Sequence, residues 1–501
     1  MAAPEPNHPL APEFPDGLDW LNVARPLTLE DLRGKVVILD FWTYGCVNCL
    51  HVAKELKTLE ERFGSRLVVI GVHSPKFDNE RNLETLRHMV VRLDRRHPVI
   101  NDVDWLLMSD YGARAWPTLV LIDPLGGVVG RVAGEGHTRL LTRKIQSLLE
   151  RYEDVLDPTP LPLDLEQDRL ANSLLAAPGK VAANDKRVAI SDTLHNQIVI
   201  ARPDGRILWT IGDRRPGLVD GRFGEARFSS PQGVFLSGDQ LFVADAGNHA
   251  VRLVDLATRK VSTLAGTGRI GHAFGSESDA RKAELRSPWD LVLDGDWLYI
   301  AMAGTHQIWR LDLVIGEIAP WAGSGREGIN DGPLEQATFS QPSGLALAGR
   351  HLYVADAEAS AVRVIDLEHG QVRTLAGKGL FNFGDQDGSF EQALLQHTSG
   401  IAADRGDTLF VADTYNHKLK RMDLKTGRVT TLAGDGMPGR GMGAAISSRL
   451  NEPGGVAVAG DRIYITDTNN DRILVYERAA RILREWELTN ANPDSSPISP
   501  Q

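Results

Sequence analysis

The chain has 501 residues, with 55 Lys and Arg against 66 Asp and Glu, so its formal net charge is −11. This acidic balance lacks the basic footprint through which nucleic-acid binders neutralise phosphates, so we expect no nucleic-acid partner. No apolar run approaches the roughly 18 residues that a membrane-spanning helix needs. The segment Met1–Pro15 is Pro-rich and acidic, without the basic start and apolar stretch of a secretory signal. We therefore expect a cytoplasmic protein without a membrane partner.

The first part of the chain alternates between strand-like and helix-like patterns. Residues 35–42 form a β-branched run that is typical of a strand buried on both faces, and apolar residues then recur every three to four positions over 46–63, which predicts a helix. The same reasoning predicts strands at 66–73, 98–100, 118–122 and 128–132, and helices at 82–93 and 138–152. Since 118–132 reads as a hairpin after a strand–helix–strand–helix series, we expect an α/β domain with a mixed sheet.

The chain contains two cysteines, Cys46 and Cys49, which form a single C-x-x-C at the start of the first predicted helix. A disulfide-stapled secreted fold would scatter its cysteines, and two thiols alone do not make a zinc site, so we expect neither a metal nor a cofactor. A helix N-terminus lowers the pKa of a thiol placed there. Cys49, one turn further on, can resolve a mixed disulfide formed at Cys46. The alternative is a pair of incidental thiols.

The segment from Asp40 to Cys49, DFWTYGCVNC, resembles the active-site segment of thioredoxins. The resemblance implies that Asp40 is the buried acid that serves proton transfer to the resolving thiol. The alternative is that Asp40 is a polar residue at a strand edge. The intervening pair Val47-Asn48 and the preceding Gly45 depart from the usual thioredoxin residues, so the direction of the redox chemistry is left open.

Trp116-Pro117-Thr118 stands before the third long apolar strand, at the place of the thioredoxin cis-proline. The resemblance implies a cis bond at Pro117, close to the C-x-x-C, where substrate backbone can pair; without it, Pro117 is a strand-start proline. It further implies a protein client, a thiol reductant, and substrate contacts from Trp42, Tyr44 and Trp116. His51, His73, His97 and His137 are interpreted as architecture.

From about residue 171 the chain is repetitive. The string LFVAD at 241–245 returns at 409–413 and, in looser form, at 188–192, 298–302, 352–356 and 463–467, so that successive copies lie 53 to 57 residues apart. Strand starts with Pro and Gly precede the copies, and Ala-Gly turns end the strand that follows four of them. Four strands per unit and six units predict a six-bladed β-propeller.

Asn248-His249 and Asn416-His417, each three residues after the repeated Asp, resemble the signature of NHL repeats. We interpret the Asp and Asn as structural residues that bond turn backbone between the second and third strands of a blade; a ring of metal ligands on the channel is the alternative. Met302 replaces the Asp in the third unit. Outside the thioredoxin features, the strings at 71–77, 97–102 and 134–137 resemble the NHL repeat-containing protein 2 group, in which a thioredoxin-like domain precedes a six-bladed NHL propeller.

These observations predict a flexible segment at 1–20, a thioredoxin-like domain at 21–155, a linker at 156–170, a propeller at 171–490 and a tail at 491–501. The leading functional hypothesis is a thiol–disulfide oxidoreductase whose propeller binds a protein client. Two alternatives stay open: a scaffold whose cysteines are never turned over, and a propeller with lactonase- or lyase-type activity of its own.

Overall fold

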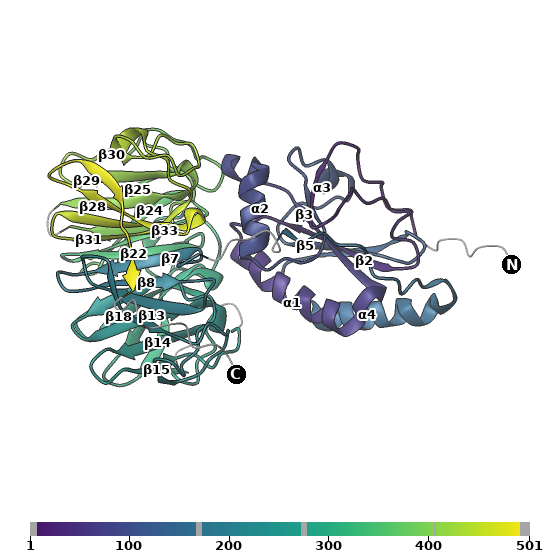
Figure 1. Cartoon of the computed structure of the whole chain (residues 1–501), viewed down its shortest axis with the longest axis horizontal. Coiled ribbons are helices and arrows are strands. Elements are labelled where there is room, and N and C mark those ends of the chain that lie inside the picture. The colour runs from purple at the N-terminus through teal and green to yellow at the C-terminus, as the bar shows by residue number, and fades with distance from the viewer. Residues whose placement is uncertain (1–7, 167–172, 272–277, 405–406, 491–501) are drawn as a thin grey trace. The chain divides into compact units, whose positions relative to one another are not determined.

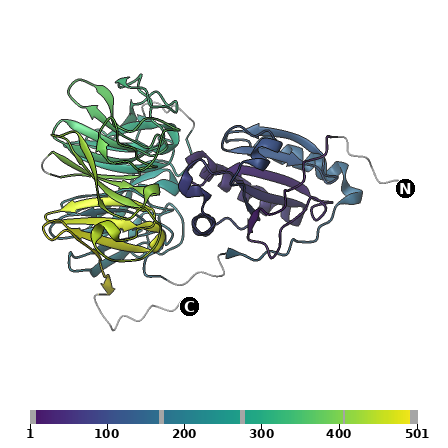
Figure 2. The same cartoon turned by 90° about the horizontal axis from the view of Figure 1, so that it is seen from above.

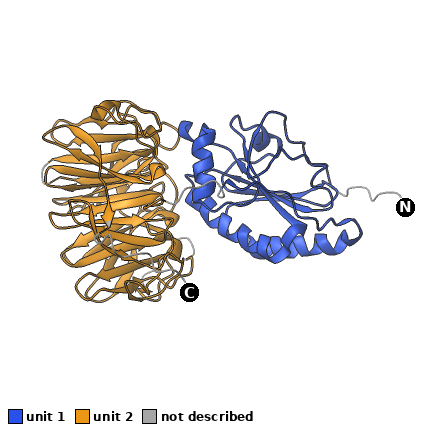
Figure 3. Cartoon of the chain, viewed as in Figure 1, with its two compact units in different colours: residues 1–172 blue, residues 173–501 orange. Residues whose placement is uncertain are grey.

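The computed structural model describes residues 8–166, 173–271, 278–404 and 407–490. The chain divides into two compact units, residues 1–172 and 173–501 (Figure 3), and each is described by itself. The expected tail at 491–501, residues 1–7 of the expected flexible segment and residues 167–170 of the expected linker lie outside the described residues.

Unit 1 is built on one mixed six-stranded sheet in the order β1-β4-β3-β2-β5-β6. β2, β3 and β4 run parallel, whereas β5 and β6 form the antiparallel hairpin that the sequence predicts. The sequence pattern did not show β1 and α3, because elements of three and five residues are too short to display a period. The strands are β1 (Asp19–Leu21), β2 (Val36–Trp42), β3 (Leu67–His73), β4 (Val99–Asn101), β5 (Thr118–Ile122) and β6 (Val128–Ala133), and the helices are α1 (Val47–Phe63), α2 (Leu83–Arg92), α3 (Leu106–Asp110) and α4 (Thr138–Arg151).

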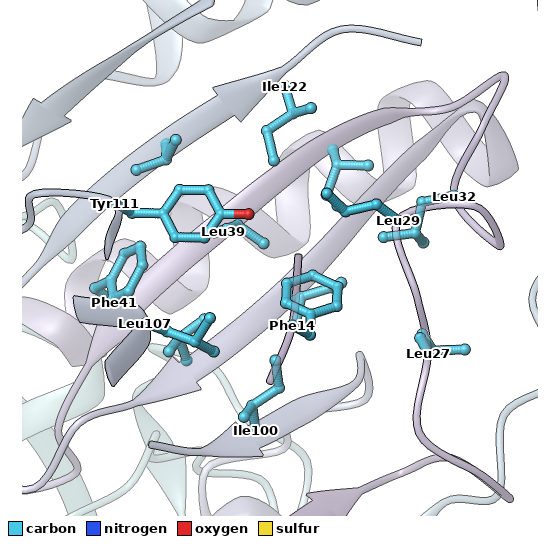
Figure 4. Close-up of a cluster of buried hydrophobic side chains, with 14 of the residues drawn as sticks. Phe14, Leu27, Leu29, Leu32, Leu39, Phe41, Ile100, Leu107, Tyr111 and Ile122 are labelled. Atoms are coloured by element: carbon cyan, nitrogen blue, oxygen red, sulfur yellow. The ribbon is translucent and has the colours of Figure 1, made fainter. Parts of the chain in front are cut away.

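Both faces of this sheet are buried, because successive residues of a strand point to opposite sides. Leu39 and Phe41 of β2 pack with Phe14 and with Leu107 of α3 on one face (Figure 4). On the other face lie α1 and α4 (Figure 1), and side chains of β2 such as Ile38 pack with side chains of both helices. Asp40 therefore falls on the α1 side of β2, which brings its carboxylate under the helix that carries the cysteines.

The segments that flank the expected domain also pack within unit 1. Phe14 is buried and makes an edge-to-face contact with Trp20, with the ring centroids 5.5 Å apart. Lys35 donates from Nζ to the carbonyl oxygens of Asp157 and Thr159. Residues 8–20 and 156–166 are therefore packed parts of unit 1. We expected a flexible segment and a linker there, because the few apolar residues of these segments show no helical or strand period.

The described residues of unit 2 form six sheets, each with four main strands that run antiparallel, as the repeat predicts. Figure 2 shows the strands of this unit from a second direction. The first three blades comprise β7 (Pro178–Ala183), β8 (Val188–Asp192), β9 (Gln197–Ala201) and β10 (Arg206–Ile211); β12 (Val234–Ser237), β13 (Gln240–Asp245), β14 (Ala250–Asp255) and β15 (Lys260–Ala265); β17 (Pro288–Asp294), β18 (Trp297–Met302), β19 (Gln307–Asp312) and β20 (Glu317–Ala322). The last three comprise β22 (Pro342–Ala348), β23 (His351–Asp356), β24 (Ala361–Asp366) and β25 (Gln371–Ala376); β27 (Gly400–Ala403), β28 (Thr408–Asp413), β29 (Lys418–Asp423) and β30 (Arg428–Ala433); β31 (Pro453–Ala459), β32 (Arg462–Asp467), β33 (Arg472–Glu477) and β34 (Ile482–Glu485).

Five blades gain a two-residue strand at their outer edge that the sequence did not reveal. In blades two to five these strands are β11 (Gly221–Arg222), β16 (Ser278–Asp279), β21 (Gly332–Pro333) and β26 (Gly388–Ser389), and in blade one it is β35 (Thr489–Asn490). The first strands of the blades, β7, β12, β17, β22, β27 and β31, contact one another in a closed ring, β31 meeting β7. A single six-bladed propeller is therefore confirmed.

Candidate functional site

The two cysteines stand where β2 gives way to α1. The chain leaves β2 at Trp42 and turns, with the Cys46 N–H bonded to the Thr43 carbonyl oxygen, and Cys46 becomes the N-cap of α1. Its Sγ accepts a hydrogen bond from the Cys49 N–H at 3.2 Å. The sulfurs of the two free cysteines lie 2.7 Å apart, the Cys49 thiol donating to Cys46. Spacing and helix start thus place both cysteines at the N-terminal end of α1, as the C-x-x-C pattern predicts.

The two thiols differ in exposure: Cys46 is partly exposed, whereas Cys49 is fully buried. Burial raises the pKa of the Cys49 thiol well above its usual value, and the hydrogen bond and charge of Cys46 and the charge of Asp40 act in the same direction. A thiol that keeps its proton at neutral pH needs a base before it can attack a disulfide.

The Asp40 side chain is completely buried on the α1 side of β2. Its Oδ2 accepts a hydrogen bond from Nη1 of Arg95 at 2.7 Å, an ion pair of which both members are buried. Its Oδ1 has no hydrogen-bond partner among the described residues. The expected buried acid is therefore present, and the structure adds a counter-charge that no motif indicated.

A second buried carboxylate fixes the turn that carries the cysteines. Glu80 is fully buried and accepts hydrogen bonds at Oε2 from the N–H groups of Lys76 and Phe77, at 2.6 and 3.1 Å. Its Oε1 accepts the Gly45 N–H at 3.3 Å. Gly45, which replaces the usual thioredoxin residue, is thus held in place by a hydrogen bond from its backbone N–H. Sequence spacing could not predict this contact.

The aromatic residues assigned to substrate contacts lie at different depths. Trp42 is fully buried and Tyr44 nearly so; the Tyr44 ring stacks on His73, with the ring centroids 5.4 Å apart. Burial lowers the pKa of His73 to about 3, so this imidazole is neutral. Trp116 keeps a partly exposed surface and meets Trp105 edge to face.

The Trp116–Pro117 peptide bond is cis, which confirms the sequence prediction. Thr118, the next residue, opens β5 opposite Phe41 of β2. Pro117 therefore lies beside the end of β2 from which the cysteine turn departs.

The repeated Asp of the propeller is a structural residue in every blade that has it. In blade two, Asp245 is fully buried and accepts hydrogen bonds from the Ser229 N–H, the Asn248 amide and the Arg252 guanidinium. Asp356, Asp413 and Asp467 accept a backbone N–H from the loop that enters their own blade in the same way, and so does Asp192. We expected the Asp to bond the backbone of the turn between the second and third strands of its blade. The structure adds a hydrogen bond from the loop that enters the blade.

The residue four positions after the repeated Asp, or after Met302 in blade three, links its blade to the next one. It stands in the left-handed region, with φ between 49° and 54°, and its side chain accepts a backbone N–H of the following blade. We call this set the blade latch; its acceptor–donor pairs are Asn196–Ser230, His249–Ser287, His306–Gln341, Ser360–His397, His417–Glu452 and Asp471–Ala177. The His of the NHL signature therefore holds neighbouring blades together.

The closed ring formed by the first strands of the blades also contains buried charges. Lys180 of β7 donates from Nζ to the carbonyl oxygen of Ser399 in blade five and lies 4.0 Å from Oδ2 of Asp290 in β17. Burial lowers the pKa of Lys180 to about 8. Among the described residues no group of three or more His, Cys, Asp or Glu side chains is placed to hold a metal ion.

Comparison with known proteins matches each unit to a family. Residues 34–128 match the thioredoxin-like family model, and residues 450–476 match that of the NHL repeat. A solved thioredoxin-like superfamily protein shares 27% identity over 28% of this chain and 96% of its own, with a TM-score of 0.26. Fold and motifs together define a thioredoxin-like domain followed by a six-bladed NHL propeller.

Relatives with both units are found among curated proteins. The human NHL repeat-containing protein 2 is 40% identical over 512 residues, covering 94% of this chain and 70% of its own length. The Arabidopsis thaliana protein SUPPRESSOR OF QUENCHING 1, chloroplastic, is 42% identical over 92% of this chain, which spans 46% of that longer protein. The chain belongs to the NHL repeat-containing protein 2 family.

No helix among the described residues is long and apolar enough to cross a membrane.

Proposed function

We propose that this protein is a thiol–disulfide oxidoreductase that acts through Cys46 and Cys49, with its propeller as the platform for a protein client. The observation that carries the proposal is the pair of sulfurs 2.7 Å apart at a helix start, one partly exposed and one buried. The buried carboxylate of Asp40 on the same side of β2 supports it. The propeller fold is commonly a protein-interaction platform, and the family resemblance extends over both units.

The proposed reaction starts from the dithiol form. The thiolate of Cys46 attacks one sulfur of a client disulfide; a mixed disulfide forms and the other client sulfur leaves as a thiolate. Asp40 then accepts the proton of Cys49, whose thiolate attacks the Cys46 sulfur. The second client sulfur leaves and takes up a proton, so the client is reduced while Cys46 and Cys49 are oxidised to a disulfide. An external dithiol reductant returns the pair to its starting state, and the cycle needs no metal or cofactor.

In this proposal the aromatic residues and Pro117 have separate roles. Trp116, partly exposed beside Pro117, contacts the client, and the Pro117 segment offers backbone to it. Trp42 and Tyr44, which are buried, act by packing beneath the turn that carries the cysteines. A cytoplasmic location belongs to the proposal, because reducing compartments keep a lone C-x-x-C available as a dithiol; the plant relative is named as chloroplastic.

The experiment is a turnover assay on the full chain with a dithiol reductant and a disulfide-bonded protein substrate such as insulin. We expect turnover by the wild-type protein, its loss in Cys46→Ser, and accumulation of a mixed disulfide in Cys49→Ser. A reduction potential measured for the pair in the same preparation places it among reductants or oxidants. If the wild-type protein shows no turnover with any dithiol reductant, the scaffold hypothesis replaces this one. A lactonase- or lyase-type propeller gains no support from the buried Lys180–Asp290 pair.

A further inference from the structure

Arg95 is a fully buried cation that none of the sequence motifs indicated. It follows α2, and its position is fixed by its own backbone: its N–H donates to the Val90 carbonyl oxygen, and its carbonyl oxygen accepts from Nδ2 of Asn22. The side chain is 1% exposed. Taking a guanidinium out of water costs several kcal/mol unless it is well paired, so a cation placed here requires a partner.

The guanidinium of Arg95 contacts three parts of the cysteine site at once. Nη1 donates to Oδ2 of Asp40 at 2.7 Å, and Nη2 reaches the carbonyl oxygen of Cys49 at 3.5 Å. Its Cζ lies 3.7 Å from the centroid of the Trp42 ring, in cation–π contact. The guanidinium thus lies over an aromatic ring, with Nη1 at the carboxylate and Nη2 at the first turn of α1.

This arrangement divides the two oxygens of Asp40 between two tasks. A carboxyl group buried without a counter-charge keeps its proton and cannot act as a base near neutral pH. Arg95 supplies the counter-charge at Oδ2, while Oδ1 has no partner among the described residues. The lone pairs of Oδ1 are therefore the ones left to receive a proton.

We propose that Arg95 is a positioning residue that keeps Asp40 ionised and leaves Oδ1 of Asp40 for the proton of Cys49. The inference rests on the proposed function, since it concerns the resolving step of the same exchange. In that step the S–H bond of Cys49 breaks, an O–H bond forms at Oδ1, and the new thiolate attacks the Cys46 sulfur of a mixed disulfide. The attacked disulfide bond breaks, and its other sulfur leaves with the electron pair.

Other titratable groups near Arg95 can be separated from this effect. His73 of β3 faces the same charge, but burial holds its pKa at about 3, so it stays neutral across the pH range of the test. Cys46 reports its own ionisation in an earlier kinetic phase. His97, whose Nδ1 lies 3.3 Å from Oε1 of Glu60, is another titratable group close to Arg95 in the chain, and His97→Asn serves as its control.

The test uses the full chain in the reduced state and the small disulfide 5,5′-dithiobis(2-nitrobenzoate). Attack by Cys46 releases the first thionitrobenzoate, and attack by Cys49 on the resulting mixed disulfide releases the second. The pH profile of the second phase reports the deprotonation of Cys49 without any client or reductant. A failure of the proposed function, which is an absence of protein-substrate turnover, is therefore distinguishable from a failure of this inference.

We expect Arg95→Met to slow the second phase near neutral pH by about 10-fold or more, since a positioned base typically contributes 10²- to 10⁴-fold. Its midpoint should move to higher pH, and Arg95→Lys should restore most of the rate because the charge is kept. A folded Arg95→Met whose second phase has the wild-type profile overturns the proposal, and so does an equal shift in His97→Asn.

The double variant Asp40→Asn with Arg95→Met keeps the proposal testable if Arg95→Met alone does not fold. Removing both members of a buried ion pair is often neutral for stability, whereas removing one is not. If Arg95 acts through Asp40, the second phase of the double variant equals that of Asp40→Asn. A double variant that is slower still shows that Arg95 acts by another route, and the proposal fails.

Discussion

Blades three and four offer a natural experiment on a buried ion pair. In blade four Asp356 accepts from Arg363, and both side chains are fully buried. In blade three the corresponding residues are Met302 and Trp309, also buried. The Met302 sulfur lies 3.4 Å from the backbone N of Arg286, in the place of the carboxylate contact to the entering loop. An apolar pair therefore occupies in one blade the site that charges occupy in another.

Arg363→Met removes one member of the pair and leaves Asp356 buried without its cation. We expect the free energy of unfolding of the propeller to fall by about 3–5 kcal/mol, the usual cost of an uncompensated buried charge. Asp356→Met combined with Arg363→Trp copies blade three and removes both charges, so it should cost less than half as much. The Thr338 carbonyl oxygen, which Arg363 also contacts, accounts for part of what remains.

The loss should also depend on pH. Burial already raises the pKa of Asp356 to about 7, and loss of Arg363 raises it further. A carboxyl with a raised folded-state pKa favours the folded state below its unfolded value, near 3.8, and this advantage is lost as pH rises through the folded value. The deficit of Arg363→Met should therefore be smaller at pH 5 than at pH 8, whereas the deficit of the double variant should not change in this way.

The assay is urea unfolding of the full chain, followed by hydrogen exchange on peptides of β23 and β24 so that blade four is observed directly. Wild-type protein and both variants are compared at the two pH values. The reasoning is refuted if Arg363→Met costs less than about 1 kcal/mol at pH 8, a value within the range of an ordinary point substitution. It is equally refuted if the double variant is as unstable as the single one.

Three further predictions follow from exposure and hydrogen bonding. Alkylation of the reduced protein should label Cys46 first and Cys49 slowly, because Cys46 is partly exposed and Cys49 is buried; preferential labelling of Cys49 would reverse their roles. His417→Ala should destabilise the propeller by about 1–3 kcal/mol by orphaning the Glu452 N–H, whereas His417→Ser, the residue type of blade four, should cost less in the same unfolding assay. Burial lowers the pKa of His73 to about 3, so its imidazole NMR signals should stay those of a neutral ring from pH 7 down to pH 4, and protonation near pH 6.5 would contradict its buried position.

The parts of the fold with a clear period could be predicted from the sequence. Alternation of apolar runs and helical spacing gave the mixed sheet and the main helices of unit 1, and recurrence of one string gave the number of blades. The two-residue outer strands could not be found in this way, because so short a strand has no pattern. The packed segment around Phe14 was missed for a similar reason, since its prolines resemble those of a linker.

The site was predictable only where chemistry follows from local spacing. Cys46, Cys49 and Asp40 stand within ten residues of one another, and a helix start after a strand brings them together. Arg95 lies 55 residues from Asp40 in the chain, on a loop after another helix. A buried carboxylate requires a counter-charge, but with 55 Lys and Arg available no spacing rule selects this one.

Ring closure shows how the repeated residues work beyond their own blade. Five of the six blade junctions are crossed by the continuous chain, whereas blades six and one meet without a direct link between their main strands. That junction uses the same latch as the others: Oδ1 of Asp471 accepts the Ala177 N–H at 2.7 Å. β35 adds a second tie by pairing in parallel with β10, so the last described residues join the first blade. Because a closed ring leaves no blade with an unpartnered face, these contacts stabilise all six blades and not the last one alone.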